Sequence, residues 1–149
     1  MQRASAAMLP DGRRMHLHHG PIDLIVETFG GDMQAACRRA QARFETVLDE
    51  LVSELPELRC PADADLSFQG AVAARMQQAV APFAREFVTP MAAVAGAVAD
   101  EILCAMLDDD EYSKAYVNNG GDTAFHLTQG ETIRAAVAND HPARIAINA

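Results

Sequence analysis

The feature that most constrains the fold is a change of hydrophobic period near residue 30, from two residues to between three and four. Apolar and polar residues alternate from residue 21 to 28, which is typical of a half-buried strand. Residues 14–19 alternate more weakly, and the Gly20-Pro21 link between the two segments predicts a tight turn. We therefore expect an antiparallel pair of strands directly ahead of a helix.

A long amphipathic helix is predicted to follow this pair of strands. Asp32, after Gly30-Gly31, is a favourable N-cap, and Pro56 stops the helix. Between them, apolar residues recur at spacings of three and four, at Met33, Cys37, Ala40, Phe44, Val47, Leu51 and Leu55. They share one helical face, and because strands flank the segment, a helix packed on a sheet is favoured over a coiled coil with a similar repeat.

Two further helices are expected in the middle of the chain. The second runs from residue 68 to about residue 81. The third begins at Thr89-Pro90, because Thr is favoured at the cap and Pro at the first helical position. The third helix is rich in alanine, so another backbone or a ligand can approach it closely. Asp100 and Glu101 at its centre argue against a membrane span.

The last third of the chain is strand-like. Turn residues separate four short segments with the spacing of a β-meander, at residues 114–118, 123–128, 131–138 and 143–148. The prediction is an α+β fold, in which residues 1–12 are a flexible lead-in and residues 13–149 form one domain. The last alternating segment stops almost at the end of the chain, so we expect this domain to be incomplete at its C-terminal end.

Charge and cysteine content limit the compartment and the partners. The chain has 12 Lys and Arg against 21 Asp and Glu, a formal net charge of -9. This balance disfavours a broad nucleic-acid interface and an anionic membrane surface. The three cysteines are far apart and form no paired motif, which favours a reducing, cytoplasmic compartment. We therefore expect neither a nucleic-acid nor a membrane partner.

The strongest candidate site is the polar turn formed by Asn118, Asn119, Gly120, Gly121 and Asp122. Asn-Gly favours a plain hairpin turn, because the central positions of such a turn need positive φ. Two asparagines and an aspartate exceed what a turn requires, so a second interpretation is a ligand loop whose backbone N–H groups hold a phosphate. The sequence leaves both alternatives open.

Two other polar features have both a functional and a structural interpretation. The run Thr89-Pro90-Met91-Ala92 is either an ordinary helix start or an anion site made by a hydroxyl group and exposed N–H groups. Three histidines, His16, His18 and His19, fall in the first predicted strand. Nothing in the sequence fixes a metal-ligand geometry for them, so exposed strand histidines are the favoured interpretation.

Four runs of sequence together resemble a prokaryotic family that is related to ApbE. The ApbE proteins themselves are FAD:protein FMN transferases, once named for thiamine biosynthesis. The runs are residues 20–27, 42–45, 89–100 and 116–122. In the third run, Gly96 and Asp100 match the latter part of a glycine-rich helix-start segment of that family. In the fourth, the polar turn matches an Asn-x-Gly-Gly-Asp-like loop beside the flavin nucleotide.

The resemblance implies an ApbE-like fold related to the T-fold, with three helices packed on an antiparallel sheet. It implies that FAD or FMN is bound by the helix start and the polar turn, at Thr89, Pro90, Met91, Ala92, Gly96, Asp100, Asn118, Asn119, Gly120, Gly121 and Asp122. It also implies Mg²⁺. The family's later Asp and Thr ligands for this ion fall in a segment that this sequence does not contain, so the catalytic and metal-binding residues stay unassigned.

Two functions are therefore expected of this chain. The first is flavin-nucleotide binding, with transfer of FMN from FAD to a protein as the activity. The alternative is a non-catalytic module on the same fold, which binds a small ligand or supports assembly. The predicted partner is a small-molecule nucleotide in both cases, and formation of a homo-oligomer is left open.

Overall fold

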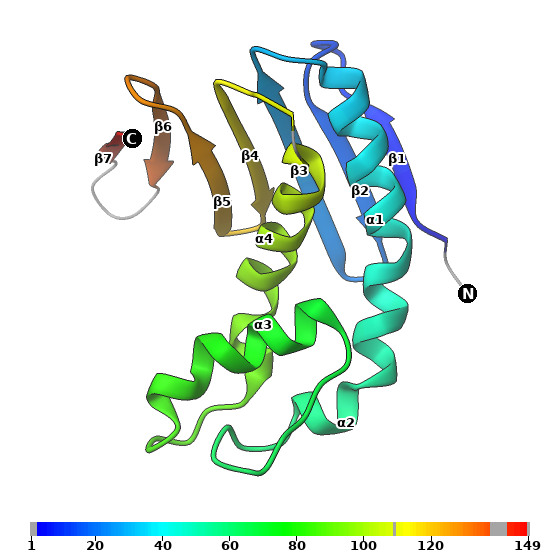
Figure 1. Ribbon diagram of the computed structural model, residues 1–149, viewed down its shortest axis with the longest axis vertical. Coiled ribbons are helices and arrows are strands. Elements are labelled where there is room, and N and C mark those ends of the chain that lie inside the picture. Colours follow the sequence, from blue (N-terminus) through cyan, green and yellow to red (C-terminus); the bar gives the residue numbers. More distant parts are fainter. Residues whose placement is uncertain (1–2, 109, 138–142, 149) are drawn as a thin grey trace.

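The protein is an α+β domain built on a five-stranded antiparallel sheet, seen in a computed structural model that describes residues 3–108, 110–137 and 143–148 (Figure 1). Each strand of the sheet pairs with the next one along the chain. The strands are β1 (Ser5–Met8), β2 (Met15–His19), β3 (Ile22–Phe29), β4 (Lys114–Asn119) and β5 (Asp122–Leu127). The predicted α+β class and antiparallel sheet are confirmed.

All the helices lie between β3 and β4 in the sequence. They are α1 (Met33–Ser53), α2 (Leu55–Leu58), α3 (Ala71–Val80) and α4 (Val94–Leu107), with short 3₁₀ segments η1 (Ala81–Phe83) and η2 (Pro90–Ala93). The long helices α1 and α4 lie side by side over one face of the sheet. Helix α3 packs on α4 and η2, away from the sheet (Figure 1). The expectation of three helices packed on the sheet is therefore wrong for α3.

The strands near the C-terminal end do not all join one meander. The four predicted segments are confirmed as strands β4, β5, β6 (Thr132–Val137) and β7 (Ala143–Asn148). Strands β6 and β7 pair with each other in a separate two-stranded antiparallel sheet. The meander thus ends at β5, and the last hairpin lies beside that edge as a sheet of its own (Figure 1).

The turn between β2 and β3 explains the register of the first hairpin. Gly20 has φ +57°, and His19 pairs with Ile22 across the two-residue turn. A positive φ at the first central position, followed by proline, fits the type II′ turn that suits the twist of a hairpin. In this register Leu17 and Leu24 face the helices and are fully buried. The predicted antiparallel pair is confirmed.

Helix α1 begins and ends for local reasons. The Asp32 side chain accepts a hydrogen bond from the backbone N–H of Ala35 at 3.0 Å, which confirms the predicted N-cap. Ala36, Ala40, Phe44, Val47 and Leu51 are buried. The helix ends at Ser53, and Pro56 lies in the first turn of α2, where its missing N–H is not needed.

The predicted lead-in of residues 1–12 contains a strand. Strand β1 pairs with β2 from Ser5 opposite His18 to Met8 opposite Met15. Its sequence, Ser-Ala-Ala-Met, has too few large apolar residues for a readable alternation. The prediction of a flexible lead-in is therefore wrong for residues 5–8. Pairing with β2 orders this segment, although its own side chains show no strand pattern.

One segment of the described chain, Pro90–Leu107, is long and apolar enough to cross a membrane, with a mean hydropathy of 1.6. Its residues Val98, Ile102 and Met106 are buried between the sheet, α1 and α3. Its exposed side carries Asp100. One side of this helix thus packs in the core, while 39% of the segment as a whole is buried.

Candidate functional site

The polar turn 118–122 is a closed two-residue hairpin between β4 and β5. Asn119 pairs with Asp122, and Gly120 has φ +61° while Gly121 does not have a positive φ. This combination fits the type II′ class, in which only the first central residue needs the left-handed region. The plain-turn geometry is therefore what the structure contains, and the turn is not an open loop.

The two asparagines of this hairpin face opposite sides of the sheet. Asn118 Nδ2 donates a hydrogen bond to Thr123 Oγ1 at 2.9 Å, across the strand pair on the face without helices. Asn119 Nδ2 donates to the backbone oxygen of Ala95 at 3.1 Å, in the first turn of α4. This hydrogen bond joins the hairpin to the start of α4, and the resemblance assigns both segments to one nucleotide site.

The structure brings only part of the predicted helix-start segment to the hairpin. Gly96 follows Ala95, and a Cβ atom at Gly96 would have no neighbour within 4 Å. Asp100 is exposed one turn further along α4, and Thr89 precedes η2 without a side-chain capping bond. Pro90 is buried, Met91 is half-buried and Ala92 is exposed. Of the predicted helix-start segment, the Ala95–Gly96 turn of α4 is thus the part that lies next to the hairpin.

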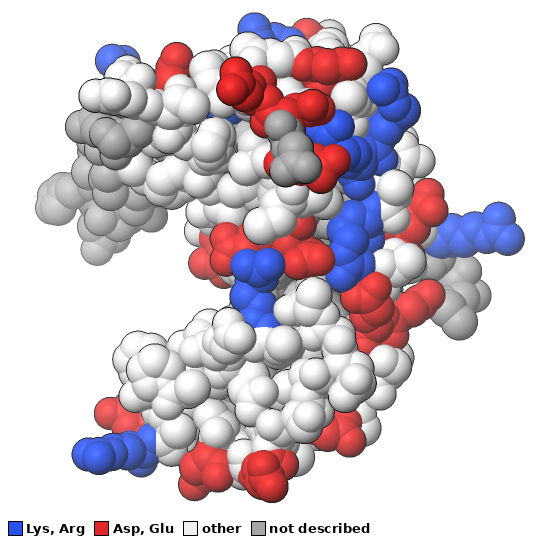
Figure 2. Space-filling model, in the orientation of Figure 1, with Lys and Arg blue, Asp and Glu red and all other residues white. Residues whose placement is uncertain are grey.

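The surface is hollowed between the sheet and α3 on the side that carries the helices, as Figure 2 shows. Positions Gly120 and Gly121 also have open space where a Cβ would stand. Backbone without side chains can approach a ligand closely. The hairpin and the turn of α4 around Gly96 therefore leave room for a ligand beside the main chain.

A cavity of about 720 Å³ lies on the opposite face of the sheet, which carries no helix. The described residues around it come from the sheet, the β4–β5 hairpin, the β6–β7 sheet and the β1–β2 connection. They are Arg14, Ile25, Tyr116, Asn118, Gly120, Gly121, Thr123, Phe125, Ile133, Arg134, Ala135, Ala136 and Ile147. The volume is within the range of small-molecule sites, roughly 300–1,000 Å³.

The charged side chains of this cavity are cationic. Arg14 and Arg134 are charged, and none of the described lining residues is Asp or Glu. Asp11 accepts a hydrogen bond from Arg14 Nε at 2.5 Å and others from the backbone N–H groups of Arg13 and Arg14. The backbone hydrogen bonds, first among these causes, lower the pKa of Asp11 to about 2. The carboxylate that holds Arg14 is thus ionised at neutral pH.

A second polar group on this face centres on Tyr116. Its hydroxyl donates to Glu27 Oε2 at 2.7 Å, and Arg13 Nε donates to Glu27 Oε1 at 3.0 Å. Burial, and then the hydrogen bond to Glu27, raise the pKa of Tyr116 above its ordinary value. The phenol therefore stays protonated and acts as a donor at neutral pH.

The histidines of β2 form no metal site with their neighbours. His16 Nε2 lies 2.9 Å from Asp23 Oδ1, and the ring of His19 meets that of Phe44 edge-on. Throughout the described ranges, no group of three or more His, Cys, Asp or Glu side chains is placed to hold a metal ion. The interpretation of all three as exposed strand residues is wrong for His19, which is 4% exposed, and His16 and His18 are half-buried.

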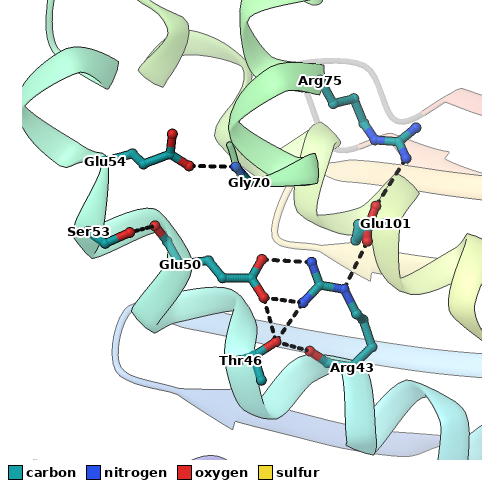
Figure 3. Close-up of polar contacts among 8 residues, drawn as sticks. All are labelled: Arg43, Thr46, Glu50, Ser53, Glu54, Gly70, Arg75 and Glu101. Atoms are coloured by element: carbon teal, nitrogen blue, oxygen red, sulfur yellow. Dashed lines mark hydrogen bonds and ion pairs between the residues drawn. The ribbon is translucent and has the colours of Figure 1, made fainter. Parts of the chain in front are cut away.

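An ion-pair network joins the three longest helices (Figure 3). Arg43 of α1 binds both carboxylate oxygens of Glu50 at 2.8 Å and donates through Nε to Glu101 of α4, also at 2.8 Å. Arg75 of α3 donates to the other oxygen of Glu101 at 3.1 Å. Glu54 accepts the backbone N–H of Gly70 at the start of α3. These contacts orient α3 relative to α1 and α4.

Of the predicted site residues, Asn118, Gly120 and Gly121 line the cationic cavity, whereas its arginines and aromatic residues were not predicted. Tyr116 and Asn118 have the same parity along β4, so alternation alone places them on one face. Phe125 and Thr123 share that face on β5. The alternation along the strands therefore indicated that these strand residues share a face. Arg14 and Arg134 are 120 positions apart in the sequence, and only the folded chain brings them to one cavity.

No curated protein is similar enough to the chain to count as a match. The family model described as AbpE bacteria matches residues 6–149. This match begins within β1 and spans the sheet, all the helices and the β6–β7 hairpin. The chain therefore belongs to the family described as AbpE bacteria.

Proposed function

We propose that this protein binds a flavin nucleotide where the β4–β5 hairpin meets the start of α4. The observation that carries the proposal is the hydrogen bond from Asn119 to the backbone of Ala95. It joins the two segments that resemble the nucleotide-binding motifs of ApbE-like proteins, next to the hollow of Figure 2. The ApbE relationship, with its T-fold-related sheet, is part of the proposal.

Each element of this site has a physical role in binding. Gly96, Gly120 and Gly121 have no side chain to block a ligand, because a Cβ at each position would meet open space. Asp122 is exposed at the first position of β5 and can accept hydrogen bonds from ribityl hydroxyl groups. Thr89 contributes a hydroxyl group at the start of η2. The flavin ring system itself supplies the redox chemistry when it is bound.

Transfer of FMN from FAD to a protein is the activity that the ApbE-like resemblance implies, with Mg²⁺ on the pyrophosphate. Three metal-ligating side chains do not converge anywhere in the part of the chain described here, so we assign no residue to that ion. We place the protein in the cytoplasm, since its three cysteines are free. Our proposal therefore rests on binding, and transfer is a separate outcome to measure.

Titration of the full chain with FAD, which carries no phosphate monoester, followed by the change in its flavin fluorescence, tests the proposal. Asp122→Ala should weaken FAD binding by about tenfold, since a hydrogen bond to a charged group contributes about 1.5–3 kcal/mol. Asp65→Ala is the matched control, because Asp65 is exposed in the linker before α3. Unchanged affinity in Asp122→Ala would remove the hairpin from the site.

Two further outcomes separate the candidate activities. Covalent FMN on an added acceptor protein, formed from FAD only when Mg²⁺ is present, would establish transfer. A chain that binds no flavin but self-associates would favour the assembly alternative. Phe83 and Phe87 are 62% and 87% exposed beside α3, and exposed aromatic residues of this kind suit a protein interface.

A further inference from the structure

The face of the sheet without helices carries features of a binding site, and its arginines and aromatic side chains have no part in flavin binding at α4. It contains the cavity of about 720 Å³ described above. A smaller cavity of about 360 Å³ adjoins it and shares Tyr116, Ile133 and Arg134. Both lie between the sheet and strand β6. The two cavities thus form one continuous groove.

The charge of this groove is opposite to that of the chain. The protein has a formal net charge of -9, yet the described lining of the two cavities contains Arg14, Arg134 and Lys114 and no acidic residue. Three carboxylates lie next to this lining and are paired: Glu27 with Arg13 and Tyr116, Asp11 with Arg14, and Glu131 with Lys114 at 3.9 Å. The groove itself is lined by cations, and such a lining attracts anions.

The arginine from the β1–β2 connection is held in place before any ligand arrives. The hydrogen bond from Arg14 to Asp11 uses Nε, and the Arg14 side chain remains 46% exposed. The ionised Asp11 is itself fixed by two backbone N–H groups of the same turn. The terminal nitrogens of Arg14 can therefore donate to an anion with little loss of side-chain entropy.

Aromatic side chains line the same groove. Phe125 is 39% exposed on β5, although phenylalanine is ordinarily buried, and Tyr116 lies opposite it on the neighbouring strand. Phe29 in the smaller cavity already lies against two cations, with Lys114 Nζ at 4.5 Å and Arg13 at 4.8 Å from its ring centre. An exposed aromatic ring beside arginines suits a ligand with a planar ring and an anionic group.

We propose that the groove on the helix-free face is a second binding site, which takes a planar ring bearing a phosphate monoester. The two arginines Arg14 and Arg134 match the charge of the phosphate, which is about -1.5 to -2 at neutral pH. Phe125 and Tyr116 contact the ring. The site lies on the other face of the sheet from the Asn119–Ala95 contact and shares only the hairpin residues Asn118, Gly120 and Gly121 with the proposed flavin site.

A single fluorescent reporter can test this site directly. The chain contains no tryptophan, so Phe125→Trp introduces a unique indole into the groove. Titration with AMP should change the emission of this indole, whereas adenosine, which has the same ring without the phosphate, should bind at least about tenfold more weakly. Calorimetry of the unaltered chain with both compounds checks that the reporter has not created the site.

Arginine variants identify the phosphate contact. In the reporter background, Arg14→Gln and Arg134→Gln should each weaken AMP binding by about tenfold and bring its affinity close to that of adenosine. Arg85→Gln is the control, because Arg85 is exposed beyond η1 and lies outside both cavities. Equal binding of AMP and adenosine, or no emission change with AMP, would overturn the proposal.

Discussion

The two faces of the five-stranded sheet have the same strands and opposite chemistry. On the face that packs against α1 and α4, Leu17, Leu24, Val26 and Val117 are fully buried. Glu27 follows Val26 on β3 and therefore lies on the other face, where it binds Arg13 and Tyr116. Because successive side chains of a strand point to opposite sides, one sequence supplies both a core and a polar surface.

This difference shows which strand positions can hold polar, charged or aromatic side chains without disturbing the core. The covered face must fill the space beneath two helices at close-packed density, so size and apolarity are constrained there. The open face has no helix over it, and its side chains meet cations, aromatic rings and a cavity. We therefore expect substitutions on the first face to change stability and those on the second to change binding.

The largest expected difference is between two neighbouring residues of β3. Leu24 is fully buried on the covered face, and Ile25 lines the cavity on the open face. Leu24→Ala should lower the free energy of unfolding by about 2–5 kcal/mol, because it leaves a void in the core. Ile25→Ala should cost less than about half of that, because its side chain is only partly buried.

Urea denaturation followed by far-ultraviolet circular dichroism measures this pair. The two variants remove closely similar amounts of hydrocarbon from adjacent positions, so each is the control for the other. If Ile25→Ala were as destabilising as Leu24→Ala, the open face would be packed as tightly as the covered one. The contrast between the faces would then be lost.

Local patterns were sufficient to predict much of the sheet and of α1. The parity of residues along β3 put Leu24 and Val26 on the buried face, and Asp32 marked the start of the helix. These signals need only a few neighbouring residues. Strand β1 was not predicted, because its four residues, Ser-Ala-Ala-Met, show no alternation of polar and large apolar side chains. The strand is ordered by its pairing with β2.

The position of α3 and the second cavity depend on contacts that no local pattern contains. The helix itself was predicted, and Val72, Met76 and Val80 form its buried face, but a helical period does not say which element covers that face. Arg75 reaches Glu101 across 26 positions, and this ion pair helps to hold α3 on α4. Charged residues at such separations carry no pairing signal in one sequence.

The next expected effect concerns that network on the covered side. Glu101 is 15% exposed in its side chain and accepts hydrogen bonds from Arg43 and Arg75. Glu101→Gln should lower the free energy of unfolding by about 1–3 kcal/mol, since it leaves partly buried guanidinium groups with weaker partners. Glu45→Gln is the control, because Glu45 is exposed on α1. Similar urea midpoints for the two variants would contradict the role assigned to the network.

Acid should weaken the same network. The hydrogen bond from Arg43 is the main cause that lowers the pKa of Glu50 below its ordinary value. A lowered native pKa means that the stabilisation is present above the unfolded pKa and is lost as pH falls through the native pKa. In the wild type, stability should therefore decline below about pH 4 in part through this pair. Glu50→Gln should make that decline shallower in urea denaturation series.

The smallest expected effect is on the open face and appears at high pH. Burial and the hydrogen bond to Glu27 raise the native pKa of Tyr116. The stabilisation is therefore complete below the unfolded pKa, about 10, and is lost as pH rises from there toward the native pKa. Tyr116→Phe should cost about 0.5–1.5 kcal/mol at neutral pH and reduce the alkaline loss.

The second tyrosine of the chain provides the control for this prediction. The hydroxyl group of Tyr112 donates to the backbone oxygen of Asp32, at the start of α1. Tyr112→Phe removes the same atom from the helix side of the molecule and should leave the alkaline loss due to Tyr116 in place. If Tyr116→Phe lost as much stability at high pH as the wild type, the phenol would not contribute to the stability of this group, and Glu27 would be paired with Arg13 alone. The polar group of the open face would then be an ion pair at the surface, where such pairs contribute little.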